Sequence, residues 1–361
     1  MKEHARDAAT SAGVRWLSRA SWAWLAVACV LGGALWGLGD AWWPATVLLF
    51  IGRWIFLLPL AVLVPAVLVV RRSLLVPLAL AALVVAGPVM GFRTGWRRLL
   101  PHSAGTHVRL VTFNANNDAR VAADLPLILA GWDADIVALQ ECDEVIAEAA
   151  RRIPAWHLHV VRQLCLLSRY PILDTQVMDR SALEQVNEDE AAHIGGSGDV
   201  ARYALQTPQG VVSVTNLHLE TPRKGLEDLL QGAFNPSRLR ANTHLRAIES
   251  TLARRWVDSS RSPALVAGDF NTPVESRIFQ KSWADLTDAF SRAGFGLGMT
   301  KDNGWIKVRI DHVLSGPGWV ADRAVVGGDL GSDHLPLIVD LTLVGGSRRP
   351  GIANSRTADG R

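Results

Sequence analysis

The chain has little cysteine, and its first hundred residues contain almost no acid. Cys142 and Cys165 are the only cysteines outside the apolar N-terminal third. A bridge between them would need an extracytoplasmic location, and we expect two buried thiols instead. Residues 1–100 hold ten Lys/Arg and three acids. The other 27 basic and 31 acidic residues give residues 101–361 a net charge of −4. This deficit of positive charge excludes attributing the sequence pI near 9.0 to a nucleic-acid-binding surface of the globular part.

Charge is also absent from three long apolar stretches, at about residues 21–39, 54–70 and 74–92. Each is close to the roughly 20 residues that a helix needs to cross a hydrocarbon core. A cleaved signal peptide is the alternative for the first stretch, but no clear small-residue cleavage site follows it and two more spans do. We therefore expect residues 1–100 to form a membrane anchor of three transmembrane helices. Tryptophans gather near the ends of these stretches, as in interfacial aromatic belts: Trp22, Trp24, Trp36, Trp42, Trp43, Trp54 and Trp96.

The positions of the basic residues predict the orientation in the membrane. Four basic residues precede the first span, and Arg71 and Arg72 separate the second from the third. Both groups lie on one side of the membrane, which should be cytoplasmic. Three arginines that follow the third span argue against this. We predict a multi-pass protein of a plasma membrane or a bacterial inner membrane, with the globular part on the extracytoplasmic side.

Residues 101–345 alternate short β-branched runs with longer helical ones, as expected for one globular domain. The strands and helices follow one another in irregular order without an internal repeat. This favours a mixed-sheet sandwich with helices outside over a single doubly wound sheet. The tail, residues 346–361, has no apolar periodicity and is expected to be disordered. The predicted strands are His107–Phe113, Ile136–Gln140, Leu164–Leu167, Val211–Leu217, Ala264–Ala267, Arg309–Leu314 and Leu337–Val344, and the predicted helices are Ala119–Gly131 and Ser237–Trp256.

Polar residues lie at or near the ends of these predicted strands, where side chains project from a rigid support. They are Asn114 and Asn116 after LVTF, Glu141 after DIVALQ, His218 after VVSVTNL, Asp269 and Asn271 after ALVAG, Asp311 in RIDHVL, and Asp333-His334 before LPLIVDL.

These residue types suit the hydrolysis of a phosphoester. Glu141, with asparagine oxygens nearby, offers the hard ligands that Mg²⁺ prefers. Asp269 can orient or deprotonate an attacking water, and Asn271 can donate a hydrogen bond to a phosphoryl oxygen. His334 can stabilise developing negative charge when a carboxylate, for which Asp311 is the candidate, fixes its tautomer.

Each residue also has a structural explanation when it is taken alone. An acid at a strand end often caps a helix, and Asp269-x-Asn271 can form an Asx turn. Asp311 could pair with Arg309, and a single histidine such as His218 is often a hydrogen-bonded structural residue. The occurrence of all these residues in one ordered series favours the functional interpretation.

The ordered series FNANN, DIVALQE, LLSRYPI, NLHLE, GDFNTP, RIDHVL and GSDHLPL, between His107 and Leu343, resembles the endonuclease/exonuclease/phosphatase superfamily. These metal-dependent hydrolases are related to pancreatic deoxyribonuclease, apurinic endonucleases, sphingomyelinases and inositol-polyphosphate 5-phosphatases. The resemblance implies an α/β fold, a four-layer sandwich of two mixed β-sheets flanked by helices. At the position where deoxyribonuclease-type members have an acid that supports the second histidine, this chain has Ser168.

The resemblance also implies roles for the site residues. It implies a divalent metal ion, Mg²⁺ or Mn²⁺, near Glu141, Asn114, Asn116 and Asp333. It implies catalytic roles for Asp269 with the attacking water, for His334 with Asp311 in the transition state, and for His218 near the leaving group. It implies that Asn271 binds the substrate phosphate.

The predicted function is that of a membrane-anchored, divalent-metal-dependent phosphoesterase that hydrolyses a phosphodiester or phosphomonoester by activated-water attack. The substrate could be a lipid headgroup, a nucleotide or a nucleic acid. The membrane anchor and the net charge of −4 favour a small or membrane-borne phosphoester over duplex DNA. One alternative is a nuclease that uses the same site on DNA or RNA. Another is a non-catalytic membrane module that retains the fold, against which the intact series of polar residues argues. The bilayer is the expected partner, and no protein partner is inferred.

Overall fold

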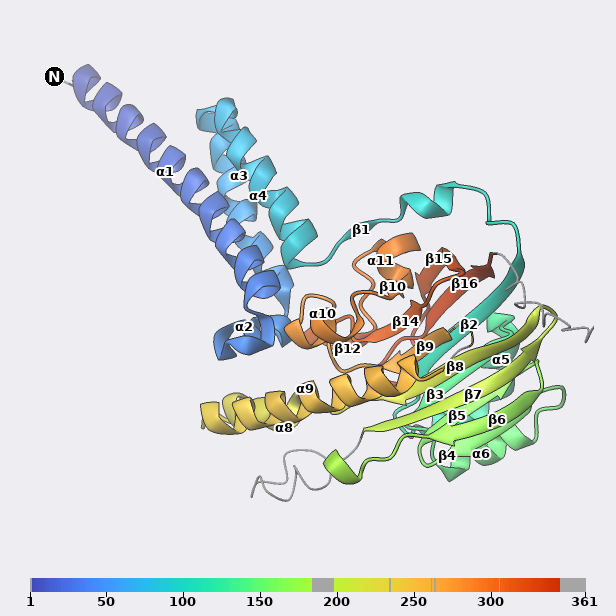
Figure 1. Ribbon diagram of the computed structural model, residues 1–361. Helices are drawn as coiled ribbons and strands as arrows, with labels where there is room; N and C mark the ends of the chain where they lie inside the picture. Colours follow the sequence, from blue (N-terminus) through green and yellow to red (C-terminus); the bar gives the residue numbers. More distant parts are fainter. Residues whose placement is uncertain are drawn as a thin grey trace, which may run out of the picture.

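The computed structural model describes residues 2–183, 198–233, 235–260, 262, 264–304 and 306–344. The predicted disordered tail lies outside the described residues. A bundle of long helices projects from a larger α/β body, and the two meet at the base of the bundle (Figure 1).

Four helices precede the body: α1 (Lys2–Gly37), α2 (Trp43–Phe50), α3 (Leu58–Val70) and α4 (Leu75–Val84). Short turns of 3-10 helix join them at Gly39–Ala41, Arg53–Leu57 and Arg72–Leu74, and a π-helical turn, Val85–Val89, extends α4. Three segments are long and apolar enough to cross a membrane: Ala12–Gly37, Arg53–Val70 and Arg72–Val89. They overlap the three predicted spans.

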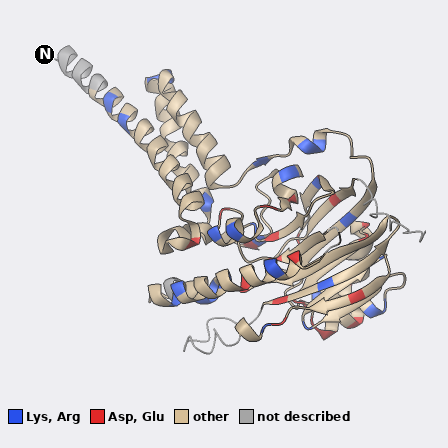
Figure 2. Cartoon of the chain, in the orientation of Figure 1, with Lys and Arg blue, Asp and Glu red and all other residues tan. Residues whose placement is uncertain are grey.

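The long helices α1, α3 and α4 pack on one another through small and aliphatic side chains, including Ala28, Leu63, Val67 and Ala81. Charged residues are sparse along the bundle and gather toward its outer end and over the body (Figure 2). Apolar side chains on its outward surface are exposed, with Val69 88% exposed. A surface of this kind suits a lipid surrounding.

Two six-stranded mixed sheets form the centre of the body. The first contains β2 (Thr106–Asn114), β3 (Ile136–Gln140), β4 (His157–Val161), β5 (Leu164–Ser168), β15 (Trp319–Val326) and β16 (Leu337–Leu343), in the order β15-β16-β2-β3-β5-β4. The second contains β6 (Ile172–Val177), β7 (Asp199–Thr207), β8 (Gly210–His218), β9 (Ala264–Asp269), β10 (Thr287–Asp288) and β14 (Asp311–Ser315), in the order β10-β14-β9-β8-β7-β6. The pairs β2/β3 and β8/β9 are parallel, and the other neighbours are antiparallel. Two small ribbons join β1 (Arg93–Thr94) to β11 (Phe295–Gly296) and β12 (Lys301–Asn303) to β13 (Ile306–Val308).

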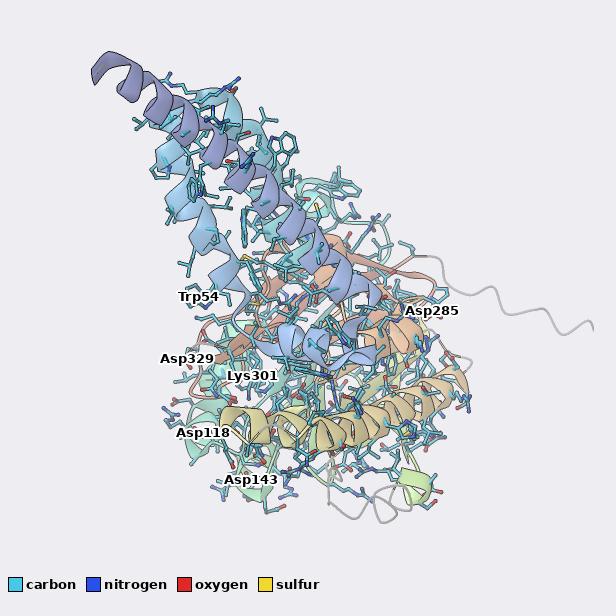
Figure 3. The ribbon with its side chains drawn as sticks, turned by 90° about the vertical axis from the view of Figure 1, so that its left-hand side faces the viewer. Trp54, Asp118, Asp143, Asp285, Lys301 and Asp329 are labelled. Carbon is cyan, nitrogen blue, oxygen red and sulfur yellow. A yellow bond between two sulfur atoms is a disulfide. The ribbon has the colours of Figure 1, made fainter. Side chains whose placement is uncertain are left out.

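Helices cover the outer face of each sheet, which gives four layers. The helices of the body are α5 (Ala119–Trp132), α6 (Glu144–Arg151), α8 (Arg223–Leu230), α9 (Pro236–Asp258), α10 (Arg277–Trp283) and α11 (Ala289–Ala293). One apolar core lies between the sheets, a second joins α5 and α6 to the first sheet, and a third joins α9 and α10 to the second sheet. Asp118 and Asp143, labelled in Figure 3, accept hydrogen bonds from the first turns of α5 and α6 and fix where these helices begin.

The predicted fold class is confirmed, and every strand predicted from the sequence is present within a few residues. The strands β4, β6, β7 and β15, and the strands of two or three residues, were not predicted from the sequence. β4 and β6 are edge strands, and none of their residues is fully buried, so they lack the continuous apolar runs of the central strands.

Buried charges join the bundle to the body. Asp40, in the turn after α1, accepts hydrogen bonds from the Ser276 hydroxyl and the Ile278 N–H, and its Oδ1 lies 3.9 Å from Arg246 Nη1. Arg53, before α3, lies 3.4 Å from the Glu275 carboxylate. Ser276 and Glu275 belong to the loop that follows β9, so this loop is held from the side of the helical bundle.

Apolar contacts reinforce the same joint. Leu35, Leu49, Phe50 and Val89 of the helical region pack against Val308 and Ile310 of the body. Gly39 has a φ of +45°, and a Cβ there would lie 2.9 Å from the Arg277 backbone nitrogen. Only glycine lets the chain turn this close to α10 without displacing it.

Candidate active site

The parallel strand pairs bring the predicted site residues to one end of the two sheets. In β2 and β3, Asn114 is in register with Gln140, directly before Glu141; in β8 and β9, His218 is in register with Asp269. Gly268 lets β9 approach β8, because its φ is +149° and a Cβ would lie 1.9 Å from the Leu217 carbonyl oxygen.

Asp269 is at the centre of the site. Its Oδ2 lies 3.1 Å from the Asn114 amide nitrogen, 3.7 Å from His218 Nε2 and 3.6 Å from His334 Nε2. The carboxylate is 1% exposed. Its other oxygen, Oδ1, accepts a hydrogen bond from the Asn271 N–H at 2.8 Å. Asp269 is therefore fixed in position and faces both histidines.

His334 and Asp311 form a buried pair, with His334 Nδ1 at 2.9 Å from Asp311 Oδ2. The Thr300 hydroxyl accepts hydrogen bonds from the Asp311 and Ile310 N–H groups. The Ser332 hydroxyl accepts a hydrogen bond from the His334 N–H. Arg309 does not pair with Asp311, because its guanidinium donates to Asp288 instead. With Nδ1 engaged by the carboxylate, His334 Nε2 is the nitrogen that faces Asp269.

Glu141 follows β3 in a left-handed backbone conformation, with a φ of +46°. Its Oε1 accepts a hydrogen bond from the Asn114 amide at 3.0 Å and lies 3.9 Å from His218 Nε2. Asn116 and Asn271 also have positive φ, at +53° and +50°. Such conformations are costly for non-glycine residues and concentrate at functional sites.

The expectation of two free thiols is wrong. Cys142, the residue after Glu141, forms a disulfide with Cys165 of β5. The two cysteines lie on neighbouring strand ends at a Cα–Cα distance of 5.9 Å, which suits a bridge. Spacing in the sequence could not reveal this adjacency, because it depends on the antiparallel register of β3 and β5.

Asp333 and Asn271 lie at the edge of the same site. Asp333 Oδ2 accepts a hydrogen bond from Lys301 Nζ at 2.5 Å, and its Oδ1 lies 4.0 Å from His334 Nε2. The Asn271 amide donates to the Leu219 carbonyl at 2.8 Å. Because an amide nitrogen carries two hydrogens, one remains for a substrate. Lys301, labelled in Figure 3, lies on the face seen there, below Trp54 and the bundle.

A polar layer beneath the site was not foreseen from the sequence. Gln140 donates to Asn216 at 2.7 Å, and the Asn216 amide donates to the Leu139 and Cys165 carbonyls. These bonds join the two sheets directly under Glu141. The only sequence signal was the position of Asn216 in the NLH segment. Ser168 lies at the other end of β5, opposite Ile136, so it does not support His218.

The charges of the site shift one another's protonation. Burial and the neighbouring Asp311 raise the pKa of Asp269, against the opposite effects of His334 and His218. Burial alone would raise the pKa of Asp311, but His334 outweighs it and the pKa is lowered. Burial alone would lower the pKa of His334, but Asp311 and Asp269 outweigh it and the pKa is raised. The site thus favours an imidazolium paired with the Asp311 carboxylate.

Residues 111–334 match the model of the endonuclease/exonuclease/phosphatase family. The chain belongs to this family. Its members are metal-dependent hydrolases of phosphoester bonds, so the predicted enzyme class is confirmed. No curated protein matches the sequence.

Solved structures of this family resemble the chain only distantly. TDP2 of D. rerio, humanized by 14 mutations, has 14% identity and a TM-score of 0.48, covering 65% of this chain and 99% of its own. A family protein of Bacteroides thetaiotaomicron has 16% identity and a TM-score of 0.48, covering 67% and 99%. A mannosyl-6-phosphatase of Bacteroides thetaiotaomicron VPI-5482 has 14% identity and a TM-score of 0.46, covering 65% and 99%. None of them identifies a substrate for this chain.

The donor set of this family member fits a hard divalent cation. Carboxylates and amides converge at the strand ends, and oxygen is the ligand atom that Mg²⁺ and Mn²⁺ prefer. Two buried carboxylate oxygens, Asp311 Oδ1 and Asp333 Oδ1, have no hydrogen-bond partner within the described part of the chain. Asp269, Asp311 and His334 also offer ligand atoms within 4.8 Å of one another. Unsatisfied buried carboxylate oxygens beside such a cluster are consistent with a cation-dependent site.

Proposed function

We propose that the protein is a membrane-anchored phosphoesterase that hydrolyses a phosphodiester or phosphomonoester by attack of an activated water. The observation that carries this proposal is the position of the buried Asp269 carboxylate, within 4 Å of the Asn114 amide and of both histidines. A base for water and two proton-carrying groups for the phosphoryl and leaving oxygens thus meet at one point.

The proposed ligands of the divalent ion are Glu141 and Asp333, with Asn114 and Asn116 beside them. When bound, the ion neutralises phosphate charge and lowers the pKa of a coordinated water. The Asn114 amide donates to both Glu141 and Asp269, so it fixes their separation. The unpartnered Asp333 Oδ1 supports its inclusion in this set.

Asp269 is proposed to orient the attacking water and accept its proton at Oδ2. A raised pKa favours that role, because a carboxylate of ordinary pKa is a weaker base at neutral pH. His334 is proposed to remain protonated and to donate from Nε2 to a phosphoryl oxygen as negative charge develops. Asp311 holds the imidazolium through Nδ1 and keeps Nε2 directed at the site.

Asn271 and His218 complete the proposed machinery. The second amide hydrogen of Asn271 is proposed to bind the substrate phosphate while the first stays on the Leu219 carbonyl. His218 is proposed to deliver a proton from Nε2 to the leaving oxygen, since that nitrogen faces both Glu141 and Asp269. Protonation of the leaving group avoids the release of an alkoxide.

A small or membrane-borne phosphoester is the proposed substrate. The net charge of −4 of residues 101–361 is unfavourable for binding a long polyanion, which normally requires a basic surface. Apolar segments such as Ala12–Gly37 would hold the body beside a bilayer. Hydrolysis of DNA or RNA by the same residues is the second candidate.

We infer further that the body is extracytoplasmic. Arg71 and Arg72 lie between α3 and α4, at the end of these helices away from the body, as expected for the cytoplasmic side. Arg97, which seemed to argue against this, is paired with Asp322 of the body at 2.6 Å. The Cys142–Cys165 disulfide also favours an oxidising compartment. Protease accessibility in intact cells and spheroplasts tests this orientation.

The catalytic proposal is tested with the full-length protein in detergent, because buried ion pairs join the helices to the body. Plasmid DNA, RNA, a phospholipid diester, phosphoinositides and a nucleotide are assayed with Mg²⁺, Mn²⁺ and EDTA. We expect metal-dependent release of product from a lipid or small phosphoester, lost in Asp269→Asn and His334→Gln. Preferred cleavage of DNA or RNA would favour the nuclease. No turnover, together with no metal-dependent rise in melting temperature, would reject the enzyme.

A further inference from the structure

A pocket of about 400 Å³ lies on the side of α9 away from the second sheet, between the turn after α1, the start of α2, and α10. Four basic side chains line it: Arg240 and His244 from α9, and Arg277 and Lys281 from α10. Asp40 also lines it; its Oδ2 accepts hydrogen bonds from Ser276 and Ile278, and its Oδ1 lies 3.9 Å from the buried Arg246 guanidinium.

Two of the basic side chains are available for a ligand. Arg240 and Lys281 are exposed, and within the described part of the chain neither forms an ion pair. Arg277 is half-buried and donates to the Gly37 carbonyl at 3.0 Å, which holds its guanidinium at the pocket. With three Lys/Arg side chains against the single acid Asp40, which is paired with Arg246, the pocket has a net positive charge and is suited to an anion.

An apolar groove of about 340 Å³ adjoins this pocket. Val30, Leu31 and Ala34 of α1 form one side, and Pro44, Val47 and Leu48 of α2 form the other. Trp42 and Trp43 line both the groove and the basic pocket. Indole rings concentrate at the level of lipid headgroups, between hydrocarbon and water. In a bilayer with the two tryptophans at the headgroup level, the groove would lie on the hydrocarbon side and the basic pocket on the polar side.

We propose that this composite site binds one anionic phospholipid, with its phosphate among Arg240, His244, Arg277 and Lys281 and an acyl chain between α1 and α2. The inference rests on the membrane-anchor part of the proposed function and is independent of the hydrolytic part. The site is distinct from the catalytic centre, because the opposite face of α9 packs on the second sheet. An anionic lipid matches both the positive charge and the apolar groove.

Native mass spectrometry of the full-length protein in neutral detergent tests the site, with the Asp269→Asn variant as background so that bound lipid is not hydrolysed. The probes are phosphatidylglycerol, phosphatidylcholine and glycerol 3-phosphate. We expect one phosphatidylglycerol to bind in preference to phosphatidylcholine, and glycerol 3-phosphate to bind far more weakly because it lacks acyl chains.

Two variants, each with a control, test the basic pocket and the apolar groove separately. Arg240→Gln/Lys281→Gln should lower the preference for phosphatidylglycerol by about thirtyfold, because each basic residue near a lipid phosphate contributes about 1 kcal/mol. Arg255→Gln/Arg323→Gln removes two exposed charges elsewhere and should leave it unchanged. Ala34→Phe fills the groove and should weaken binding, whereas Ala26→Phe adds the same bulk to an exposed position of α1.

Equal binding of phosphatidylglycerol and phosphatidylcholine by the parent would overturn the proposal, as would equal effects of the charge variant and its control. Equal binding of glycerol 3-phosphate and phosphatidylglycerol would show a simple phosphate site and reject the acyl groove. Extraction of the chain from membranes by alkaline carbonate would reject the membrane anchor itself. The absence of hydrolysis in the parent protein would reject only the catalytic proposal, since lipid binding is measured without turnover.

Discussion

The helical bundle and the α/β body bury different kinds of side chain. In the bundle, small and aliphatic residues fill the interior, and a buried hydroxyl such as Ser21 bonds only to its own helix, at the Leu17 carbonyl. In the body, polar groups cross between elements, as when Gln140 bonds Asn216 on the other sheet. The interior of the bundle is specified by how well its apolar side chains fit together. The interior of the body is stable only when its buried polar groups also find partners. The residues proposed for catalysis all come from the body.

The joint between the regions departs from this division. Arg246 of α9 is fully buried, lies 5.5 Å from the Phe50 ring of α2, and has Asp40 at 3.9 Å. The same guanidinium donates to the Asn271 carbonyl at 2.8 Å. Through Arg246, Asp40 of the helical region thus helps to position Asn271, which is proposed to bind phosphate. The body and the helices should behave as one cooperative unit, so a body cut free at residue 102 would be an unsuitable test protein.

The largest expected effect lies wholly within the body. Asp269→Asn should lower kcat by about a thousandfold, because it removes the proposed base for the attacking water. Its melting temperature should be unchanged or higher, because the lost charge is one whose burial is costly. Initial rates and differential scanning fluorimetry measure the two effects. Asp174→Asn, an exposed acid of β6, is the control. A variant that keeps a tenth of the activity would exclude Asp269 as the base.

The next effect begins in the helical region. Asp40→Ala should destabilise the whole protein by about 3 kcal/mol or more, because Arg246 then stays buried without its anchor partner. The melting temperature should fall by roughly 10 °C. Activity should also fall, because Arg246 would hold the Asn271 carbonyl less firmly. The pair Asp40→Leu/Arg246→Met removes both charges and should recover part of the stability. Unaltered melting of Asp40→Ala would show that the body is independent of the helices.

The difference between the regions also explains which features the sequence predicts. Spans such as Ala12–Gly37 follow from apolar length alone, and strand-end residues such as Glu141 follow from their place after an apolar run. Both signals are local. The family resemblance then connects separate local signals into a single site.

Features that depend on register or on distant contacts were beyond the sequence. The Cys142–Cys165 bridge arises because β3 and β5 are antiparallel neighbours, although 23 residues separate the cysteines. The ion pairs of Asp40 and Lys301 are two further examples. Their partners, Arg246 and Asp333, lie 206 and 32 residues away, so only the folded arrangement reveals these pairs.

A smaller effect is expected when the disulfide of the body is removed, and the free cysteine of the bundle provides the comparison. Cys142→Ala/Cys165→Ala should lower the stability by about 3 kcal/mol, the usual contribution of a bridge that closes a loop of this length. Metal affinity should also fall, because Glu141 precedes Cys142 and loses its tether. Calorimetric titration of Mg²⁺ or Mn²⁺ and thermal unfolding measure these changes. Cys29→Ala in α1, whose thiol is free and exposed, should change neither. Identical behaviour of the two variants would show that the bridge does not position Glu141.

The smallest expected effect is a pH dependence confined to the body. Burial raises the pKa of Glu249 from 4.5 to about 7 and the Glu220 carboxylate adds to this, although a hydrogen bond from the Glu220 N–H and the charges of Arg180 and Arg246 oppose it. The folded protein then binds a proton that the unfolded chain has already released, so stability should fall as pH rises from about 5 to 7. The expected loss is about 2 kcal/mol, or roughly 5 °C in melting temperature. Glu249→Gln should remove this slope, whereas Glu148→Gln, an exposed acid on α6, should preserve it. If both variants keep the parental slope, Glu249 ionises in the folded body without cost, and the polar interior of the body is more permissive to charge than its burial suggests.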